Sequence, residues 1–172
     1  MRYCLESYKV NQLMENIVIR PALPKDGKKI CEMLCDIGAL HHNGRPDIYR
    51  DNLRKYNEEQ FADILLDPSA PVIAAVDEND AVVGYAFLQI KEVKDNAALC
   101  DRKYIYIDDF CVDESLRGRH IGRTLMTGVY DYARSIGISD IELNVWEFNE
   151  NAIKFYERCG MTTQRRHMEI KL

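Results

Sequence analysis

The stretch YIYIDDFCVDESLRGRHIGR, from Tyr104 to Arg123, brings backbone donors, cations and carboxylates together in one short segment. An apolar run ends at Val112, and a glycine- and arginine-rich loop then leads into a segment with helical apolar spacing. The first N–H groups of a helix lack intrahelical acceptors and carry partial positive charge, so they bind anions. Gly118 and Gly122 allow a ligand to approach the main chain closely.

The pattern predicts a phosphate site, with a solvated turn as the alternative reading of the same residues. The predicted anion site consists of Arg117, Gly118, Arg119, His120, Ile121, Gly122 and Arg123. No Gly-Lys-Ser/Thr follows, so the loop is not a P-loop, and the G-x-G-x-x-G dinucleotide fingerprint is absent. The net charge of -5 argues against a general nucleic-acid binder, which needs a basic face.

Two adjacent carboxylates, Asp108 and Asp109, lie within the apolar run. Neighbouring residues of a strand point to opposite faces, so one of the two could face a site and relay a proton or anchor a cation. The alternative is a carboxylate paired with a nearby arginine or exposed to solvent. The same alternation predicts a central strand that is apolar on both faces. The apolar pairs are Ile105 and Ile107 on one face, and Phe110 and Val112 on the other.

The elements that must position these residues alternate between strands and helices. Period-two and β-branched segments predict strands at 16–20, 71–76, 82–93, 104–112, 141–146 and 162–172. Helical spacing predicts helices from Asp26 to Leu40, around Phe61–Leu65, over Ile121–Ile136 and over Asn149–Cys159. We expect one α/β domain over residues 16–172, with a mixed, splayed sheet and helices on both faces. Residues 1–15 read as an N-terminal tail.

Cysteine usage and hydropathy narrow the class of protein further. The six cysteines form no CxxC pair. Cys31 and Cys35 lie one helical turn apart and precede His41 and His42, which makes a metal site conceivable, but buried apolar cysteines are the commoner case. We expect no metal. No apolar run approaches the roughly 20 residues of a membrane span, and no signal core is present, so we expect no membrane contact and a cytoplasmic protein.

The loop Arg117–Gly122 resembles the R/Q-x-x-G-x-G/A loop of the GCN5-related N-acetyltransferases (GNAT), with His120 where the family usually has its middle glycine. Backbone donation survives that change if residue 120 keeps an ordinary right-handed conformation. The later segment NENAIKFYERCGM, Asn149–Met161, is similar to the family's closing N-x-x-A-x-x-F-Y-x-x-x-G-F pattern, except at Met161. The two motifs occur in the family's order, and the resemblance extends over residues 17–172.

This resemblance implies transfer of an acetyl group from acetyl-CoA to a primary amine by direct attack in a ternary complex. It implies that Phe110, Cys111 and Val112 supply backbone hydrogen bonds to the pantetheine arm and the acetyl carbonyl. Residues 117–123 would hold the diphosphate. Asn149 would contact the pantetheine arm besides capping its helix. Cys111 leaves a covalent route formally open.

The resemblance also implies that Tyr156 donates a proton to the leaving thiolate, since a phenol has a pKa of about 10. A core aromatic, like Phe155 beside it, is the alternative. Asp108 or Asp109 could serve as the general base, and Glu147 is a weaker candidate. The histidines at 41 and 42 are expected in a loop, 41–47, of the kind the family uses to bind acceptors.

A rival reading is a non-catalytic CoA-binding or sensor domain, which would not need the tyrosine or a proton acceptor in the cleft. The acceptor stays open among small-molecule amines, protein N-termini and lysines. Family members often form dimers, so the resemblance implies a possible homodimer and leaves the oligomeric state undecided.

Overall fold

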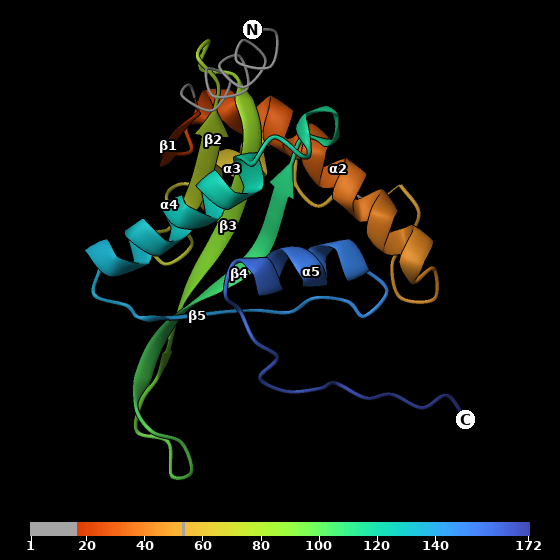
Figure 1. Cartoon of the computed structure of the whole chain (residues 1–172), viewed down its shortest axis with the longest axis vertical. Coiled ribbons are helices and arrows are strands. Elements are labelled where there is room, and N and C mark those ends of the chain that lie inside the picture. The colour runs from red at the N-terminus through yellow and green to blue at the C-terminus, as the bar shows by residue number, and fades with distance from the viewer. Residues whose placement is uncertain (1–16, 53) are drawn as a thin grey trace, which may run out of the picture.

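The protein, described here by a computed structural model of residues 17–52 and 54–172, is built around one five-stranded sheet. The tail expected at residues 1–15 lies outside the described residues. The strands follow one another in the order β1-β2-β3-β4-β5 (Figure 1), with antiparallel pairing except between β4 and β5, which are parallel. Their bounds are β1 Val18–Pro21, β2 Val72–Val76, β3 Val82–Val93, β4 Arg102–Val112 and β5 Asp140–Leu143.

Helices cover both faces of the sheet, so the expected mixed α/β architecture is confirmed. The α-helices are α2 Gly27–Gly44, α3 Glu58–Ile64, α4 Ile121–Ser135 and α5 Glu150–Arg158. The short 3-10 turns are η1 Pro24–Asp26 and η2 Glu114–Leu116. One core cluster packs α2 and α3 on the sheet, and the other packs α4 and α5 on the opposite face. Within the described part of the chain, no helix has the length and apolarity to cross a bilayer.

Helix α4 is the main support of the second core. Its buried stripe recurs every three or four residues, which places one face of the helix on the sheet. The buried members of that stripe are Ile121, Leu125, Met126, Val129 and Ala133. Gly137, with φ of +72°, adopts the left-handed conformation that follows the end of the helix. The helix therefore presents its first turn at a fixed position beside the end of β4.

Helix α2 extends through Gly44, so the loop expected at 41–47 is wrong in its first half. His41 and His42 lie in the last turn of the helix, and the N–H of Arg45 still donates to the carbonyl of His41 at 2.8 Å. The extension has a tertiary cause, because the ring of Phe148 packs where a Cβ on Gly44 would be. A contact between such distant segments is invisible to local sequence patterns.

A β-bulge in β4 overturns the predicted alternation of its side chains. Phe87 pairs with Asp109 and Leu88 pairs with Ile107, so Asp108 is an extra residue in β4. The extra residue reverses the parity of every side chain after it. All four apolar side chains that were expected on two faces therefore pack toward α4: Ile105, Ile107, Phe110 and Val112.

The last predicted strand, 162–172, is also wrong. The segment is irregular and belongs to no hydrogen-bonded ladder within the described residues (Figure 1). Its alternating sequence suits a strand, but a strand requires a neighbour with free main-chain groups alongside it. The described part of this chain places no such neighbour against it.

Candidate active site

The site begins where β4 continues beyond its neighbour β5. The parallel pairing covers only Tyr104–Ile107 of β4, because β5 ends at Leu143. From Asp108 to Val112, β4 has no strand on that side within the described residues. The sheet is thus splayed at this point, and part of the β4 main chain is free to bind a ligand.

The free groups of this edge can be assigned to particular residues. The N–H of Asp113 donates to the carbonyl of Val83 at 3.0 Å, so Asp113 faces β3. Main-chain groups point alternately to the two edges of a strand. The N–H and C=O groups of Phe110 and Val112 therefore face the open side, whereas those of Cys111 face β3. Cys111 thus lies in the ladder with β3, unlike the other two residues predicted to bind with their main chain.

A groove of about 800 Å³ lies between α2 and the segments that follow β4 and β5 in the chain. The second half of α2 forms one wall, and η2 with the start of α5 forms the other. Arg117 and Asn149, the first residues of the two sequence motifs, both line it. Arg117 also contacts Glu114 at 3.2 Å, but both side chains are exposed, so this ion pair is weak. The fold therefore brings the two motifs to one groove.

The loop between η2 and α4 contains two left-handed residues. Gly118 has φ of +81°, and a Cβ there would meet nothing within 4 Å. His120 has φ of +63° and ψ of +3°, so it does not adopt the right-handed conformation that was the condition for backbone donation at this position. The turn into α4 requires this conformation, for which glycine is the unstrained residue. A side chain there costs about 1–2 kcal/mol.

The first turn of α4 presents the anion-binding groups. The N–H of Thr124 donates to the carbonyl of His120 at 3.1 Å and is the first intrahelical bond of α4. The N–H groups of residues 121–123 precede it. A Cβ on Gly122 would lie 3.2 Å from the Phe155 ring and 3.6 Å from the Val112 side chain. This close packing ties the end of β4, the start of α4 and helix α5 together.

Asn149 caps α5, since its side-chain oxygen accepts a hydrogen bond from the N–H of Ala152 at 3.2 Å. The cap fixes the start of α5 at the groove. The capping role that the sequence favours for this residue is confirmed. Its contact with a pantetheine arm stays a prediction.

Tyr156 projects from α5 toward the open part of β4. Its ring lies edge-on to that of Phe110, at 6.2 Å between centroids, and 5.2 Å from that of Phe155. Its hydroxyl has no hydrogen-bond partner among the described residues, yet it is not sealed from solvent. Burial, aided by the charge of Asp109, raises the pKa of Tyr156 well above its usual value. The hydroxyl therefore remains protonated at neutral pH and can donate.

Asp108 and Asp109 converge on one ammonium instead of facing opposite sides. The Nζ atom of Lys55 lies 2.9 Å from Asp108 Oδ2 and 3.2 Å from Asp109 Oδ2. The bulge explains the convergence, because it turns both carboxylates toward the loop before α3. Burial tends to lower the pKa of Lys55, but the two carboxylates outweigh it and the pKa is raised.

Asp109 is the more enclosed carboxylate, with 8% of its side chain exposed against 28% for Asp108. Its other oxygen accepts a hydrogen bond from the hydroxyl of Tyr85 at 3.1 Å. Neither Lys55 nor Tyr85 was among the site residues predicted from the sequence. The hydroxyl of Tyr85 within the apolar first half of β3 could have indicated a polar partner nearby. Nothing in the sequence around Lys55 indicated a role for that residue.

Residues 39–161 match the model of the acetyltransferase (GNAT) family. The chain belongs to the GNAT family. This membership agrees with the resemblance seen in the sequence, and the free edge of β4 and the start of α4 form the candidate active site.

Several relatives and solved structures resemble this GNAT chain. The peptidyl-lysine N-acetyltransferase YjaB of Escherichia coli is 27% identical over 144 residues, which cover 84% of this chain and 81% of that protein. The solved structure of a tetramutant of the BH1408 protein from Bacillus halodurans is 31% identical in sequence, with a TM-score of 0.85. The match covers 90% of this chain and 99% of the BH1408 chain.

Other relatives match over part of their length. An L-ornithine N5-acetyltransferase of Arabidopsis thaliana is 38% identical over 55 residues, or 32% of this chain. That match spans only 24% of the plant protein, and the match to a mycothiol acetyltransferase of Renibacterium salmoninarum spans 41% of it.

An aromatic cluster flanks the carboxylates of this GNAT site. The Tyr49 ring lies 4.9 Å from that of His41 and 5.9 Å from that of Trp146, whose Nε1–H donates to the Tyr49 hydroxyl at 2.9 Å. Arg45 lies over Trp146 at 5.3 Å. Burial lowers the pKa of His41, with opposing effects from Asp109 and from the Lys55 ammonium. The end of α2 therefore supplies one side of the space around the carboxylates, although as a helix and not as the expected loop.

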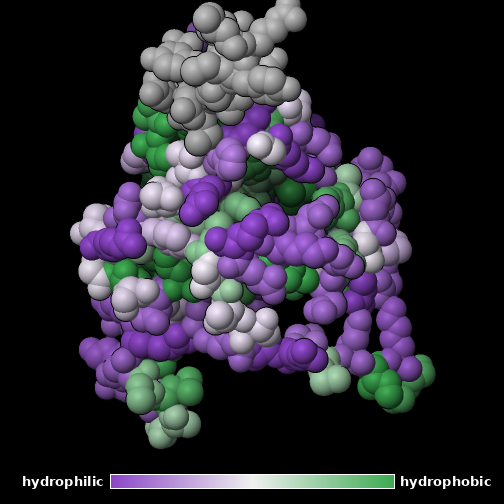
Figure 2. All heavy atoms as spheres, in the orientation of Figure 1, coloured by the Kyte–Doolittle hydropathy of each residue, from purple (hydrophilic) through white to green (hydrophobic). Residues whose placement is uncertain are grey.

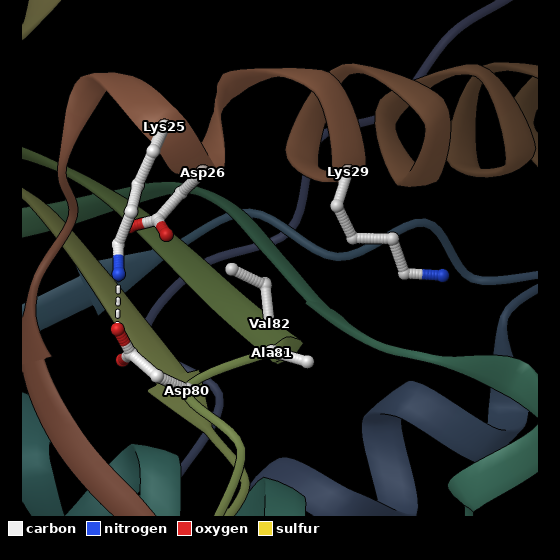
Figure 3. Close-up of a pocket in the computed structure, with 6 residues that line it drawn as sticks. All are labelled: Lys25, Asp26, Lys29, Asp80, Ala81 and Val82. Carbon is white, nitrogen blue, oxygen red and sulfur yellow. Dashed lines mark hydrogen bonds and ion pairs between the residues drawn. The ribbon is translucent and has the colours of Figure 1, made fainter.

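A second hollow, between the start of α2 and the β2–β3 turn, lies apart from these residues (Figure 3). Its lysines are already paired, Lys25 with Asp80 and Lys29 with Asp113, the latter at 2.6 Å. Asp26 in the same hollow is held by Arg20 at 2.7 Å. The hollow contains none of the free edge of β4, and its charges largely neutralise one another.

Proposed function

We propose that this GNAT enzyme transfers an acetyl group from acetyl-CoA to a primary amine by direct attack in a ternary complex. One observation carries the proposal. The free edge of β4 meets the unbonded N–H groups at the start of α4, and the first residues of the two motifs, Arg117 and Asn149, line a common groove. A strand edge suits the amide groups of a pantetheine arm, and a helix N-terminus suits its diphosphate.

In this proposal the loop and first turn of α4 bind the diphosphate of acetyl-CoA. The N–H groups of residues 121–123 supply donors, and Gly118 leaves open space in front of the main chain. The arginines at 117, 119 and 123 add local positive charge in a chain whose net charge is -5. Such local donors are required because the field of the whole molecule disfavours an anion.

The free main-chain groups of Phe110 and Val112 bind the pantetheine arm and orient the acetyl carbonyl. An N–H aimed at that carbonyl stabilises the negative charge that develops on its oxygen during attack. Cys111 has a packing role in this account. Burial raises the pKa of its thiol to about 12, which leaves little thiolate and favours direct attack over an acyl-cysteine route.

Tyr156 acts as the general acid. Its hydroxyl lies beside Phe110, carries its proton at neutral pH and has no competing partner among the described residues. When the C–S bond breaks, the leaving thiolate accepts this proton. Because its environment raises the pKa of the phenol, the hydroxyl keeps its proton throughout the neutral pH range and stays available as a donor.

Asp108 and Asp109 accept the proton of the attacking amine, directly or through water. Together with Lys55 they carry one net negative charge, which suits an incoming ammonium group. The Lys55 side chain is itself an alkyl ammonium bound between the two carboxylates, so it is an example of how such a group binds at this position. The amine must displace Lys55 from at least one carboxylate before attack, so we assign Lys55 a positioning role.

The acceptor is a primary amine of a small molecule or of a protein lysine. This class is supported by the carboxylate pair and by the printed names of relatives that act on peptidyl lysine and ornithine. The ring of Tyr49 lies beside that of His41, whose pKa responds to the charge of Asp109, so this aromatic ring is on the carboxylate side of α2. Alkyl chains that carry an amine would pack there.

The test is release of free CoA thiol from acetyl-CoA in the presence of a panel of amines. We expect amine-dependent thiol release, and acetyl-CoA at a hundredfold excess over its Kd should stabilise the fold by about 2.7 kcal/mol. Stabilisation without turnover for any amine would favour a CoA-binding sensor. If acetyl-CoA does not stabilise the fold and no amine causes thiol release, acetyl-CoA is excluded as the co-substrate.

A further inference from the structure

The carboxylate pair of the candidate site is already occupied by a primary amine of the chain itself. The Nζ atom of Lys55 lies 2.9 Å from Asp108 Oδ2 and 3.2 Å from Asp109 Oδ2. The same nitrogen lies 5.6 Å from the centre of the Tyr56 ring, which adds a cation–π contact. Three groups therefore fix the Lys55 amine at one point beside the bulge of β4.

This amine is held in place without being sealed from solvent. The side chain of Lys55 is 31% exposed, whereas that of Asp109 is 8% exposed. The carboxylate is therefore the enclosed member of the pair, and the lysine covers it from the solvent side. A ligand that enters the site meets the lysine before it meets the carboxylate.

The proton donor of the site lies on the other side of the same strand. Asp109 accepts from Tyr85, which belongs to the core cluster under α2 and α3, while Tyr156 packs in the opposite cluster beside Phe110. Asp109 and Phe110 are neighbours in β4, and the charge of Asp109 helps to raise the pKa of Tyr156. The open edge of β4 thus has an amine with its proton acceptors on one side and a phenol on the other.

We propose that Lys55 is an acceptor of this site, so that the chain acetylates its own Lys55 when no other amine is bound. The proposal rests on the proposed function, which places the attacking amine at Asp108 and Asp109. Any external amine must displace Lys55 from that position. Acetyl-CoA that binds without an acceptor therefore meets the Lys55 amine at the position of the nucleophile.

The reaction is balanced by groups already present. The Lys55 ammonium gives one proton to a carboxylate, and the lone pair of Nζ then forms a bond to the acetyl carbon. The C–S bond breaks, and the leaving thiolate takes the proton of Tyr156. The new amide nitrogen gives its extra proton to the second carboxylate. Both carboxylates release their protons to solvent and Tyr156 regains one, so the products are acetyl-lysine, free CoA and one proton.

The position of Lys55 outweighs its low content of neutral amine. The carboxylates raise the pKa of Lys55, so the nucleophilic form is rare and we expect a slow reaction. Well-oriented groups react with effective molarities of about 10⁵–10⁸ M, which no dissolved acetyl-CoA reaches at an exposed lysine. Hydrophilic side chains cover much of the face in Figure 2, and exposed lysines such as Lys103 are the competing targets.

Peptide mapping by mass spectrometry tests the proposal on the full chain, incubated with saturating acetyl-CoA and no added amine. We expect Lys55 to gain an acetyl group at least about tenfold faster than Lys103, which also pairs with a carboxylate but has a side chain 58% exposed. The rate should not change when the protein is diluted, because both reactants belong to one complex. In urea the preference for Lys55 should disappear, since it depends on the fold.

Free thiol released without an added amine provides the second readout. We expect a burst of one equivalent per chain from the wild type. Lys55→Arg keeps the positive charge but carries a guanidinium that stays protonated, so it should lose the burst. Lys103→Arg is the matched control and should keep it.

An unmodified Lys55, a rate that rises with protein concentration, or a burst that persists in Lys55→Arg would each overturn the proposal. Thiol release with added amines beside an unmodified Lys55 would overturn this inference alone and leave the proposed function standing. No thiol release with or without amines would overturn both.

Discussion

The role of Tyr156 gives the sharpest prediction for a single residue. Tyr156→Phe keeps the ring that packs on Phe110 and Phe155 and removes only the hydroxyl. We expect kcat to fall by about 10²–10⁴-fold, the usual contribution of a general acid, with the Kd for acetyl-CoA nearly unchanged. Steady-state kinetics and calorimetry measure the two quantities. Unchanged turnover would remove Tyr156 from the mechanism.

His120 carries backbone strain that a glycine would relieve. His120→Gly should raise the free energy of unfolding by about 1 kcal/mol, since φ of +63° disfavours any side chain with a Cβ. Gly118→Ala provides the opposite control and should lower it by a similar amount, because φ there is +81°. Urea denaturation measures both. A destabilised His120→Gly would show that the imidazole contributes contacts that outweigh its strain.

Burial of His41 makes stability depend on pH. Its pKa is lowered from 6.5 in the folded state, so the unfolded chain binds more protons as the pH falls below about 6.5. The stabilising contribution is therefore present above that pH and is lost on acidification. We expect the free energy of unfolding to fall between about pH 6.5 and pH 5, and His41→Asn to flatten this slope. An equal slope in the variant would contradict the burial of a neutral imidazole.

At the scale of elements, α4 packs closely on β1 through Gly128. A Cβ on this residue would overlap the side chain of Ile19. Gly128→Ala should therefore cost about 1–3 kcal/mol despite the better helix propensity of alanine. Ile19→Ala makes room, so the double variant should be more stable than the sum of the single effects predicts. Strict additivity in urea denaturation would argue against this contact.

Most elements followed from local patterns, and the exceptions have tertiary causes. The stripe of α4, the cap at Asn149 and the strands β2 to β4 all have signals within a few residues. The bulge at Asp108 does not, because an extra residue in a strand leaves the apolar alternation looking regular on each side. It reverses the faces of Phe110 and Val112 and brings the two aspartates to one lysine. Sequence alternation alone therefore misplaced the carboxylates.

The end of α2 and the C-terminal segment were misjudged for a related reason. Polar residues at 41–44 suggested a loop, but packing of Phe148 on Gly44 stabilises a further helical turn. The alternation after Gly160 suggested a strand, but alternation describes a face and does not supply a pairing edge. Both features depend on contacts between segments distant in sequence.

For the molecule as a whole, the candidate site exists only where separate elements meet. The two motifs were visible in the sequence, and their common groove could be inferred only through the family resemblance. Lys55 and Tyr85 had no motif at all, yet they set the charge and the hydrogen bonding of the carboxylates. The net charge of -5 makes the local donors at the start of α4 the main source of attraction for an anion.

The most direct measurement of the central claim is a calorimetric comparison of acetyl-CoA with S-acetylpantetheine, which has the same thioester but lacks the diphosphate and nucleotide. If the start of α4 binds the diphosphate, each chain will bind one molecule of acetyl-CoA. S-acetylpantetheine will bind at least about a hundredfold more weakly, which is a loss of about 2.7 kcal/mol in binding free energy. Equal affinities, or no heat of binding for acetyl-CoA, would contradict the account.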